Sequence, residues 1–318
     1  KDGYWFQTVD GFPALINDFW LNARITTLHA CSDLWARGAS VISAQALITI
    51  PPIHQNLQKE ILTQCLAGIR SALEPQGAKL IGGHTFESRS YLFENISRDV
   101  EISLCINGYV QPGVIPWSKG GLKPGDQILI SRGIGSGVIF AAAMKGDVSP
   151  RIVDRTISLL SQSQFHVINN LLSNTSKATL INACTDVTGF GLLGHLVEMI
   201  QTTNSNRSKL ALPLINIKLF ASQIPSLDGA KDLLKAGYSS TLAPSNRKAW
   251  SFLKKNGEES SLINLLPDKI ALDEQEVNFI KELLVDPQTC GPLVISCDSK
   301  IANELIDNYS WQKIGYVD

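Results

Sequence analysis

The chain has 318 residues, of which 44% are hydrophobic and 18% are charged, and its formal net charge is −1. This length and composition predict a soluble globular protein with a large core and room for two domains. The basic residues are scattered rather than gathered in a stripe, which argues against a nucleic-acid partner. The longest apolar runs are too short to span a bilayer, which argues against a membrane partner.

Six cysteines are spread along the chain without a C-x-x-C pair, and the five histidines are equally dispersed. This spacing argues against a zinc site and against a disulfide framework. A reducing, cytoplasmic location is therefore expected.

The first part of the chain alternates strand-like and helix-like segments. Apolar side chains recur at helical spacing in 17–37, where Asn17 or Asp18 can cap the helix, and again in 55–73. Strands are expected at 4–10, 41–50, 78–83 and 101–110, the third of them buried. The order strand, helix, strand, helix, strand, strand predicts an α/β layered domain over residues 1–115.

A proline- and glycine-rich segment at 111–126 predicts the domain boundary, so that residues 116–318 form a second α/β domain. Its expected elements are a strand near 127–131, a helix after the glycine-rich run 133–137, a long helix around 151–174, a polar loop near 203–209 and a closing strand at 311–317.

The most informative segment runs from Thr185 to Leu196, between a strand-like run and a helix-like run. Gly189 and Gly191 lie at the expected helix start, where unpaired backbone N–H groups can face a phosphate, and Asp186 can hold a cation that the phosphate shares. The segment therefore predicts a nucleotide site. A plainer interpretation is a glycine-rich turn that lets a helix pack closely on a sheet.

The same glycines, with Gly194, also match the dinucleotide fingerprint G-x-G-x-x-G. That fingerprint needs an acidic residue roughly 20 positions further on to bind the ribose hydroxyls. This chain has a polar run there, so the dinucleotide interpretation is weak.

Two more aspartates and a second glycine pair extend the candidate site. Asp10 lies at the end of the first strand, and Asp33 lies near the C-terminal end of the first helix, where it faces the negative end of the helix dipole. His29 is four residues earlier and on the same helix face. Gly82-Gly83-His84-Thr85 ends the third strand. Hard oxygen groups of this kind suit Mg²⁺ held against a polyphosphate, whereas a solvated aspartate and a simple turn are the plainer interpretations.

The motifs of this chain, in this order, resemble those of the selenophosphate synthetase (selenide, water dikinase) family over nearly the whole length. The segments that carry the resemblance are Gln7–Asp10, Cys31–Gly38, Gly82–Thr85, Asp186–Leu196, Ser240–Arg247 and Asp286–Thr289. The wider superfamily includes aminoimidazole ribonucleotide synthetase, thiamine monophosphate kinase and a hydrogenase maturation protein.

The resemblance implies a two-domain α/β (α+β) fold whose N-terminal domain binds ATP and pairs in a homodimer. It implies ATP and selenide as substrates, and selenophosphate, AMP and phosphate as products. It also implies that Mg²⁺ is bound by Asp10, Asp33 and Asp186, and that the nucleotide is contacted by Thr8, His29, Gly82, Gly83, His84, Thr85, Gly189 and Gly191.

Three departures from the family pattern change these expectations. The family's reactive cysteine or selenocysteine, its nearby lysine and a further aspartate precede the position of Lys1, so we expect this chain alone to be inactive in selenophosphate synthesis. A fusion behind an NADH dehydrogenase-like flavoprotein, found in some relatives, would suit this start. His29 replaces the usual asparagine, and Cys290-Gly291-Pro292 replaces a double-glycine run. The alternatives are a non-catalytic nucleotide-binding or dimerisation module and another kinase or synthetase of the superfamily.

Overall fold

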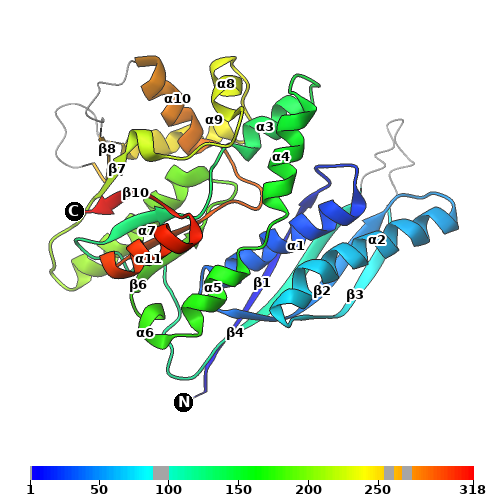
Figure 1. Cartoon of the computed structure of the whole chain (residues 1–318), viewed down its shortest axis with the longest axis horizontal. Helices are drawn as coiled ribbons and strands as arrows, with labels where there is room; N and C mark the ends of the chain where they lie inside the picture. The colour runs from blue at the N-terminus through cyan, green and yellow to red at the C-terminus, as the bar shows by residue number, and fades with distance from the viewer. Residues whose placement is uncertain (1, 89–99, 254–260, 267–273) are drawn as a thin grey trace. The chain divides into compact units, whose positions relative to one another are not determined.

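The computed structural model describes residues 2–88, 100–253, 261–266 and 274–318. The chain divides into two compact units, the first made of residues 1–116 and 160–170, and the second of residues 117–159 and 171–318 (Figure 1). Within the described ranges, every helix is too short or too polar to cross a membrane.

The first unit has the alternation that its periodicity predicted. Its elements are β1 (Tyr4–Pro13), α1 (Phe19–Trp35), β2 (Ser40–Ile50), α2 (Gln55–Leu73), β3 (Lys79–Glu87) and β4 (Glu101–Val110). The strands form one sheet in the order β1-β4-β2-β3, with β2 and β3 parallel and the other pairs antiparallel. The helices α1 and α2 pack against each other along one face of this sheet (Figure 1).

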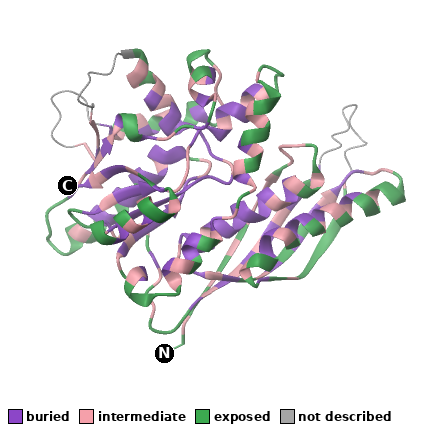
Figure 2. Ribbon diagram, in the orientation of Figure 1, coloured by how far each residue is buried: buried purple, intermediate pink, exposed green. Residues whose placement is uncertain are grey.

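The helix α1 begins after Asp18, which settles the choice between the two capping candidates. The Asp18 carboxylate accepts a hydrogen bond from the backbone N–H of Leu21 at 2.8 Å, which satisfies one of the unpaired donors of the first turn. Most of α1 is buried, including Leu28 and Trp35 (Figure 2). This helix is therefore the centre of the first unit's core.

The opposite face of the four-stranded sheet is exposed and carries several large apolar side chains. Trp5 and Val9 of β1 are each 70% exposed, and Leu47 of β2 and Phe86 of β3 are each 48% exposed. The strand register places Val9 and Leu47 on the face opposite Leu104, which is buried under the helices. We define these four side chains as the open face.

The prediction that β3 is a buried strand was wrong. β3 is an edge strand, and nearly all of its residues are exposed (Figure 2). The apolar letters at 80–81 resemble a core strand, but an edge strand has a neighbour on one side only, so its side chains lose less contact with water.

The second unit contains a six-stranded sheet in the order β6-β9-β5-β10-β7-β8, antiparallel except for the β7–β8 pair. Its strands are β5 (Gln127–Ile130), β6 (Ile181–Asp186), β7 (Ile217–Phe220), β8 (Ile263–Leu266), β9 (Leu293–Cys297) and β10 (Gln312–Val317). The α-helices after residue 135 are α3 (Ser136–Ala143), α4 (Pro150–Leu160), α5 (Phe165–Leu172), α6 (Thr175–Ala178), α7 (Gly191–Lys209), α8 (Ala230–Lys235), α9 (Ala243–Asn246), α10 (Glu274–Val285) and α11 (Ser299–Tyr309). Of these, α5 belongs mostly to the first unit.

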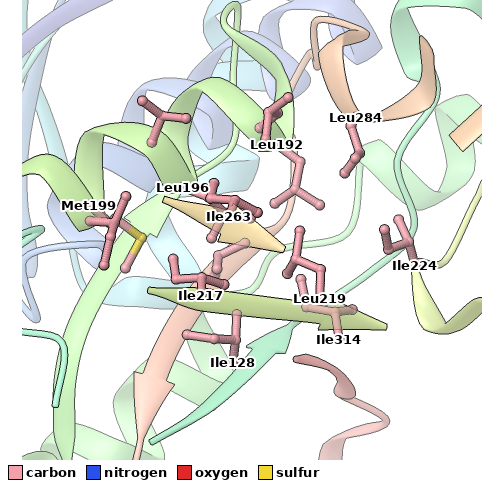
Figure 3. Close-up of a cluster of buried hydrophobic side chains, with 14 of the residues drawn as sticks. Ile128, Leu192, Leu196, Met199, Ile217, Leu219, Ile224, Ile263, Leu284 and Ile314 are labelled. Atoms are coloured by element: carbon pink, nitrogen blue, oxygen red, sulfur yellow. The ribbon is translucent and has the colours of Figure 1, made fainter. Parts of the chain in front are cut away.

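The core of the second unit lies between the sheet and α7. Leu192 and Leu196 of α7 meet Ile128, Ile217 and other strand residues in one buried cluster (Figure 3). Val187, just after β6, and Leu192, at the start of α7, both belong to this cluster, so the segment that joins β6 to α7 is anchored to the close-packed core at both ends.

Two expectations for the second half were wrong. The long helix predicted at 151–174 is broken into α4 and α5, and at the break the carbonyl of Ser161 accepts a hydrogen bond from Arg24 Nε at 2.9 Å. The polar run 203–209 is the last part of α7 rather than a loop. There Asn204 is buried and exchanges two hydrogen bonds with the backbone of Ile215, so tertiary contacts stabilise a helix that the polar letters did not suggest.

Candidate functional site

In the first unit, β1 and α1 present two adjacent polar pairs. Thr8 donates from Oγ1 to Asp33 Oδ2 at 2.6 Å, and His29 Nε2 lies 3.2 Å from Asp10 Oδ2. Thr8 and Asp10 are two residues apart on a strand, so they lie on one face of β1. His29 and Asp33 are four residues apart on a helix, so they lie on one face of α1. The structure therefore brings together four of the predicted site residues.

The Asp10 carboxyl is held in its charged form. Burial opposes ionisation, but the hydrogen bond and the charge of His29 and the backbone N–H of Gly11 outweigh it, so the pKa of Asp10 is below its ordinary value. The sequence placed His29 beside Asp33 through their spacing on the helix, and the structure also places His29 Nε2 beside Asp10, a contact that is an ion pair when the imidazole is protonated. His29 is buried, and its ring also packs edge-on against Phe12 at 5.2 Å between centroids.

The carboxylates of Asp10 and Asp33 are oxygen ligands of the kind that suits a magnesium ion shared with phosphates. In the described ranges, no three His, Cys, Asp or Glu side chains lie together in a metal-binding group. Mg²⁺ is usually held by one or two carboxylates, with water and substrate phosphates completing its coordination. Asp10 and Asp33 can supply those carboxylates, and the site does not resemble an all-protein metal cage.

The segment Gly82–Thr85 lies in the middle of β3 rather than at the end of a buried strand. The register pairs His84 with the exposed Leu47 and Thr85 with the buried Ile48, so these two side chains point to opposite faces of the sheet. Gly83 is required by packing, because a Cβ there would lie 2.1 Å from the carbonyl oxygen of Ala46.

A cavity of about 470 Å³ adjoins this segment, between β3 and α2. Residues Gly82–Thr85 line it together with Leu62, Leu66 and Arg70 of α2. The cavity thus combines apolar walls with one guanidinium group, and Arg70 is a lining residue that sequence reasoning did not identify.

In the second unit, the strand-to-helix junction forms as predicted. β6 ends at Asp186, which is 5% exposed, and α7 begins at Gly191. Gly191 has a φ of +71°, and a Cβ at this position would lie 2.8 Å from the carbonyl carbon of Val285. Glycine is therefore required both by the left-handed backbone and by the close approach of the neighbouring segment. We call residues 186–191 the junction turn.

Three motifs that are far apart in sequence meet at the junction turn. Asn246 donates from Nδ2 to the carbonyl of Gly189 at 2.8 Å, and the backbone N–H of Gln288 donates to the carbonyl of Thr188 at 3.0 Å. His195, one helical turn into α7, accepts the backbone N–H of Thr188 at Nε2, at 3.1 Å. Burial lowers the pKa of His195, although the charge of Asp186 opposes this shift.

The sequence contained these motifs but gave no role to Asn246, Gln288 or His195. Their spacing along the chain carries no periodic signal that would connect them. Only their order, as part of a family pattern, marked them as important.

The second glycine-rich run, Gly133–Gly137, is closed to an external phosphate. The side-chain oxygen of Gln288 accepts the N–H groups of Gly135 and Ser136 at 2.9 and 3.1 Å, and Asp286 Oδ2 accepts that of Gly137 at 3.0 Å. These groups satisfy the donors at the start of α3 from within the chain. The segment Asp286–Gln288 is therefore an internal cap for α3.

The replacement of a double glycine by Cys290-Gly291-Pro292 is accommodated beside this cap. Cys290 has a φ of +44°, a backbone region that disfavours most side chains. Arg132 Nη2 donates to the carbonyl oxygens of Cys290 and Gly291, at 2.6 and 3.1 Å. The guanidinium group thus stabilises the backbone where the glycine pair is absent.

The comparisons with known proteins agree with this architecture. Residues 1–109 match the family model for the N-terminal domain of AIR synthase related protein, and residues 123–227 match that for its C-terminal domain. The chain is 30% identical to a selenide, water dikinase of Myxococcus xanthus over 296 residues, which is 93% of this chain and 72% of the relative. It is 30% identical to one of Campylobacter jejuni over 308 residues, 94% of this chain and 74% of the relative.

Solved structures with the same fold have low sequence identity. A thiamine-monophosphate kinase from Stenotrophomonas maltophilia superposes with a TM-score of 0.66 at 13% identity, covering 99% of this chain and 83% of that protein. The hydrogenase maturation protein HypE in complex with ATP superposes with a TM-score of 0.62 at 15% identity, covering 100% of this chain and 77% of that protein. The predicted two-domain α/β fold is confirmed, and so is the family resemblance.

Proposed function

This chain belongs to the selenide, water dikinase family, and on that basis we propose that it binds ATP and serves the synthesis of selenophosphate. In the balanced reaction, one phosphoryl group of ATP passes to selenide and the other to water, giving selenophosphate, phosphate and AMP. The observation that carries the proposal is the 30% identity to two such enzymes over more than nine-tenths of the chain.

The polar pairs of the first unit supply carboxylates for the proposed Mg²⁺. Asp10 and Asp33 are its proposed ligands, and the bound ion would neutralise phosphate charge during transfer. His29 favours the charged form of Asp10, and the Thr8 hydroxyl orients the Asp33 carboxylate through their 2.6 Å hydrogen bond. Both carboxylates are therefore held in place before substrate arrives.

The remaining proposed contacts are distributed over both units. In the first unit, Gly82–Thr85 provide exposed backbone and a hydroxyl group for the nucleotide. In the second unit, Asp186 is a further proposed Mg²⁺ ligand, and Gly189 and Gly191 are proposed to offer backbone N–H groups of the α7 start to phosphates.

We also propose that the open face pairs with the same face of a second copy. Trp5, Val9, Leu47 and Phe86 are large apolar side chains that are 48% to 70% exposed on one face, which is typical of an interaction surface. Pairing of two such faces would bury them, and a stable interface buries on the order of 1,600 Å² in total.

The test measures ATP binding by titration calorimetry, and AMP formation from ATP with and without selenide by anaerobic phosphorus NMR, on the protein as it occurs in the cell. We expect AMP formation to depend on selenide and to produce selenophosphate. Asp33→Ala and Asp186→Ala should each weaken ATP binding with Mg²⁺ by about tenfold or more, because each removes a charged ligand.

The exposed Asp154 gives a matched control, since Asp154→Ala removes a carboxylate that belongs to none of the candidate site motifs. AMP formation without a selenide requirement would favour another kinase of the superfamily. ATP binding without turnover would favour a nucleotide-binding module. Unchanged affinity in both site variants would remove these aspartates from the site.

A further inference from the structure

Two carbonyl groups of the junction turn, those of Thr188 and Gly189, are bonded to donors within the protein. The Thr188 carbonyl accepts the backbone N–H groups of Gln288 and Gly191, both at 3.0 Å, and the Gly189 carbonyl accepts Asn246 Nδ2 at 2.8 Å. A carbonyl oxygen carries partial negative charge and would repel a phosphate. Holding both carbonyls on protein donors removes that repulsion from the start of α7.

His195 holds the same residue, Thr188, at its backbone N–H group. Its Nε2 lies 3.1 Å from Thr188 N and 3.3 Å from Thr188 Oγ1. Because an N–H group can only donate, Nε2 must be the acceptor, which places the ring proton on Nδ1. The ring is 4% exposed and contacts Phe190 at 5.9 Å between centroids, so it has little freedom to turn away.

Asn246 connects the junction turn to the end of α10. Its Nδ2 donates to the carbonyl of Val285 at 3.0 Å as well as to that of Gly189, and the residue is 6% exposed. One amide group thus satisfies two buried carbonyls. A side chain without two donor hydrogens cannot replace it.

The backbone N–H groups of Gly189 and Phe190 are left for a ligand. In the part of the chain that the structure describes, neither is bonded to a protein acceptor. The turn thus directs the Thr188 and Gly189 carbonyls to the protein and leaves two donors beside the start of α7.

We propose that His195 and Asn246 are positioning residues that hold the junction turn in the shape that accepts the phosphates of the nucleotide. They act on the Thr188 and Gly189 peptides and do not themselves touch substrate. The inference rests on the proposed function for the identity of the ligand. Its structural part, the shape of the turn, can be measured without ligand.

The experiment compares His195→Leu, His195→Gln, Asn246→Asp and the wild type. In His195→Gln the amide oxygen can accept the Thr188 N–H, whereas leucine cannot accept it. In Asn246→Asp the shape is kept but the two donor hydrogens are lost. The control is Glu198→Gln, which changes the group 3.9 Å from Nδ1 on the other side of the ring.

Two quantities are measured for each protein: the ¹⁵N–¹H signal of Gly189 without ligand, and the dissociation constant for ATP with Mg²⁺. We expect His195→Leu and Asn246→Asp to move the Gly189 signal and to weaken ATP binding about tenfold or more, the usual effect of leaving buried polar groups unpaired. His195→Gln should recover most of both, and Glu198→Gln should change neither.

An unmoved Gly189 signal with wild-type affinity in His195→Leu and Asn246→Asp would overturn the inference. Equal losses in His195→Gln and His195→Leu would also overturn it, because they would show that bulk packing rather than the accepted hydrogen bond matters. If the wild type does not bind ATP, the proposed function fails. The Gly189 signals of the ligand-free variants then still test whether His195 and Asn246 hold the turn in its shape.

Discussion

Replacing Asp286 by asparagine should change how the stability of the protein depends on pH. The carboxyl is 1% exposed, and its Oδ2 accepts hydrogen bonds from Gly137 N and Gln288 Nε2, both at 3.0 Å. Its Oδ1 is buried and has no hydrogen-bond partner in the described ranges. Burial raises the pKa of Asp286 to about 7, although its hydrogen bonds to the start of α3 and to Gln288 favour the charged form.

The sign and size follow from the two pKa values. In the unfolded chain the carboxyl ionises near its ordinary value of 3.8, whereas in the folded protein it ionises at about 7. Between these values the folded state holds a proton that the unfolded state has released, so the free energy of unfolding falls as pH rises and levels off above 7. The shift of about three pKa units corresponds to roughly 4 kcal/mol over the whole range, and to about 3 kcal/mol between pH 5 and pH 8.

The assay is urea unfolding of the wild type and of Asp286→Asn at several pH values from 5 to 8. Because asparagine does not ionise, the variant should gain about 3 kcal/mol relative to the wild type across this range. The exposed Asp154→Asn serves as the control and should show no such gain. A difference between wild type and Asp286→Asn that stays constant with pH would refute the reasoning.

Three further predictions follow from the fold. Gly191→Ala should cost several kcal/mol in thermal or urea unfolding, because φ is +71° and the Cβ would meet Val285, whereas Gly189→Ala, with only one atom at 4.0 Å, should be nearly neutral; equal losses would contradict this. Val9→Asp on the open face should convert a dimer to a monomer in sedimentation, and a wild type that is monomeric at micromolar concentration would count against pairing. Asp18→Ala should lower the free energy of unfolding by about 1 kcal/mol through loss of the α1 cap, and Asn17→Ala should lower it by less. A larger loss in Asn17→Ala would show that Asn17 is the cap.

Local pattern was sufficient for most elements of the first unit. The apolar spacing in 55–73 predicted a helix, and α2 occupies Gln55–Leu73. The alternation in 101–110 predicted a strand, and β4 occupies Glu101–Val110, with every second residue buried. These periods are imposed by the two faces that each element presents to core and solvent, so they can be read in the order of the residues.

Local pattern failed where a distant segment decides the outcome. β3 contains apolar residues that are typical of a core strand, but its position at the edge of the sheet leaves it exposed. Residues 203–209 are mostly polar, as is typical of a loop, but the hydrogen bonds between Asn204 and the Ile215 backbone stabilise them as a helix. In both cases the deciding neighbour is not adjacent in sequence.

The sequence by itself determined the family, the two-domain α/β fold and the position of the junction turn, because glycine at a strand-to-helix junction is a local backbone requirement. It placed Asp10, Asp33 and Asp186 among the candidates, and their binding role stays a prediction. Only the tertiary structure decided that His29 pairs with Asp10 and that Asn246 holds Gly189. Such contacts depend on how separate elements pack, and packing of distant residues leaves no periodic trace along the chain.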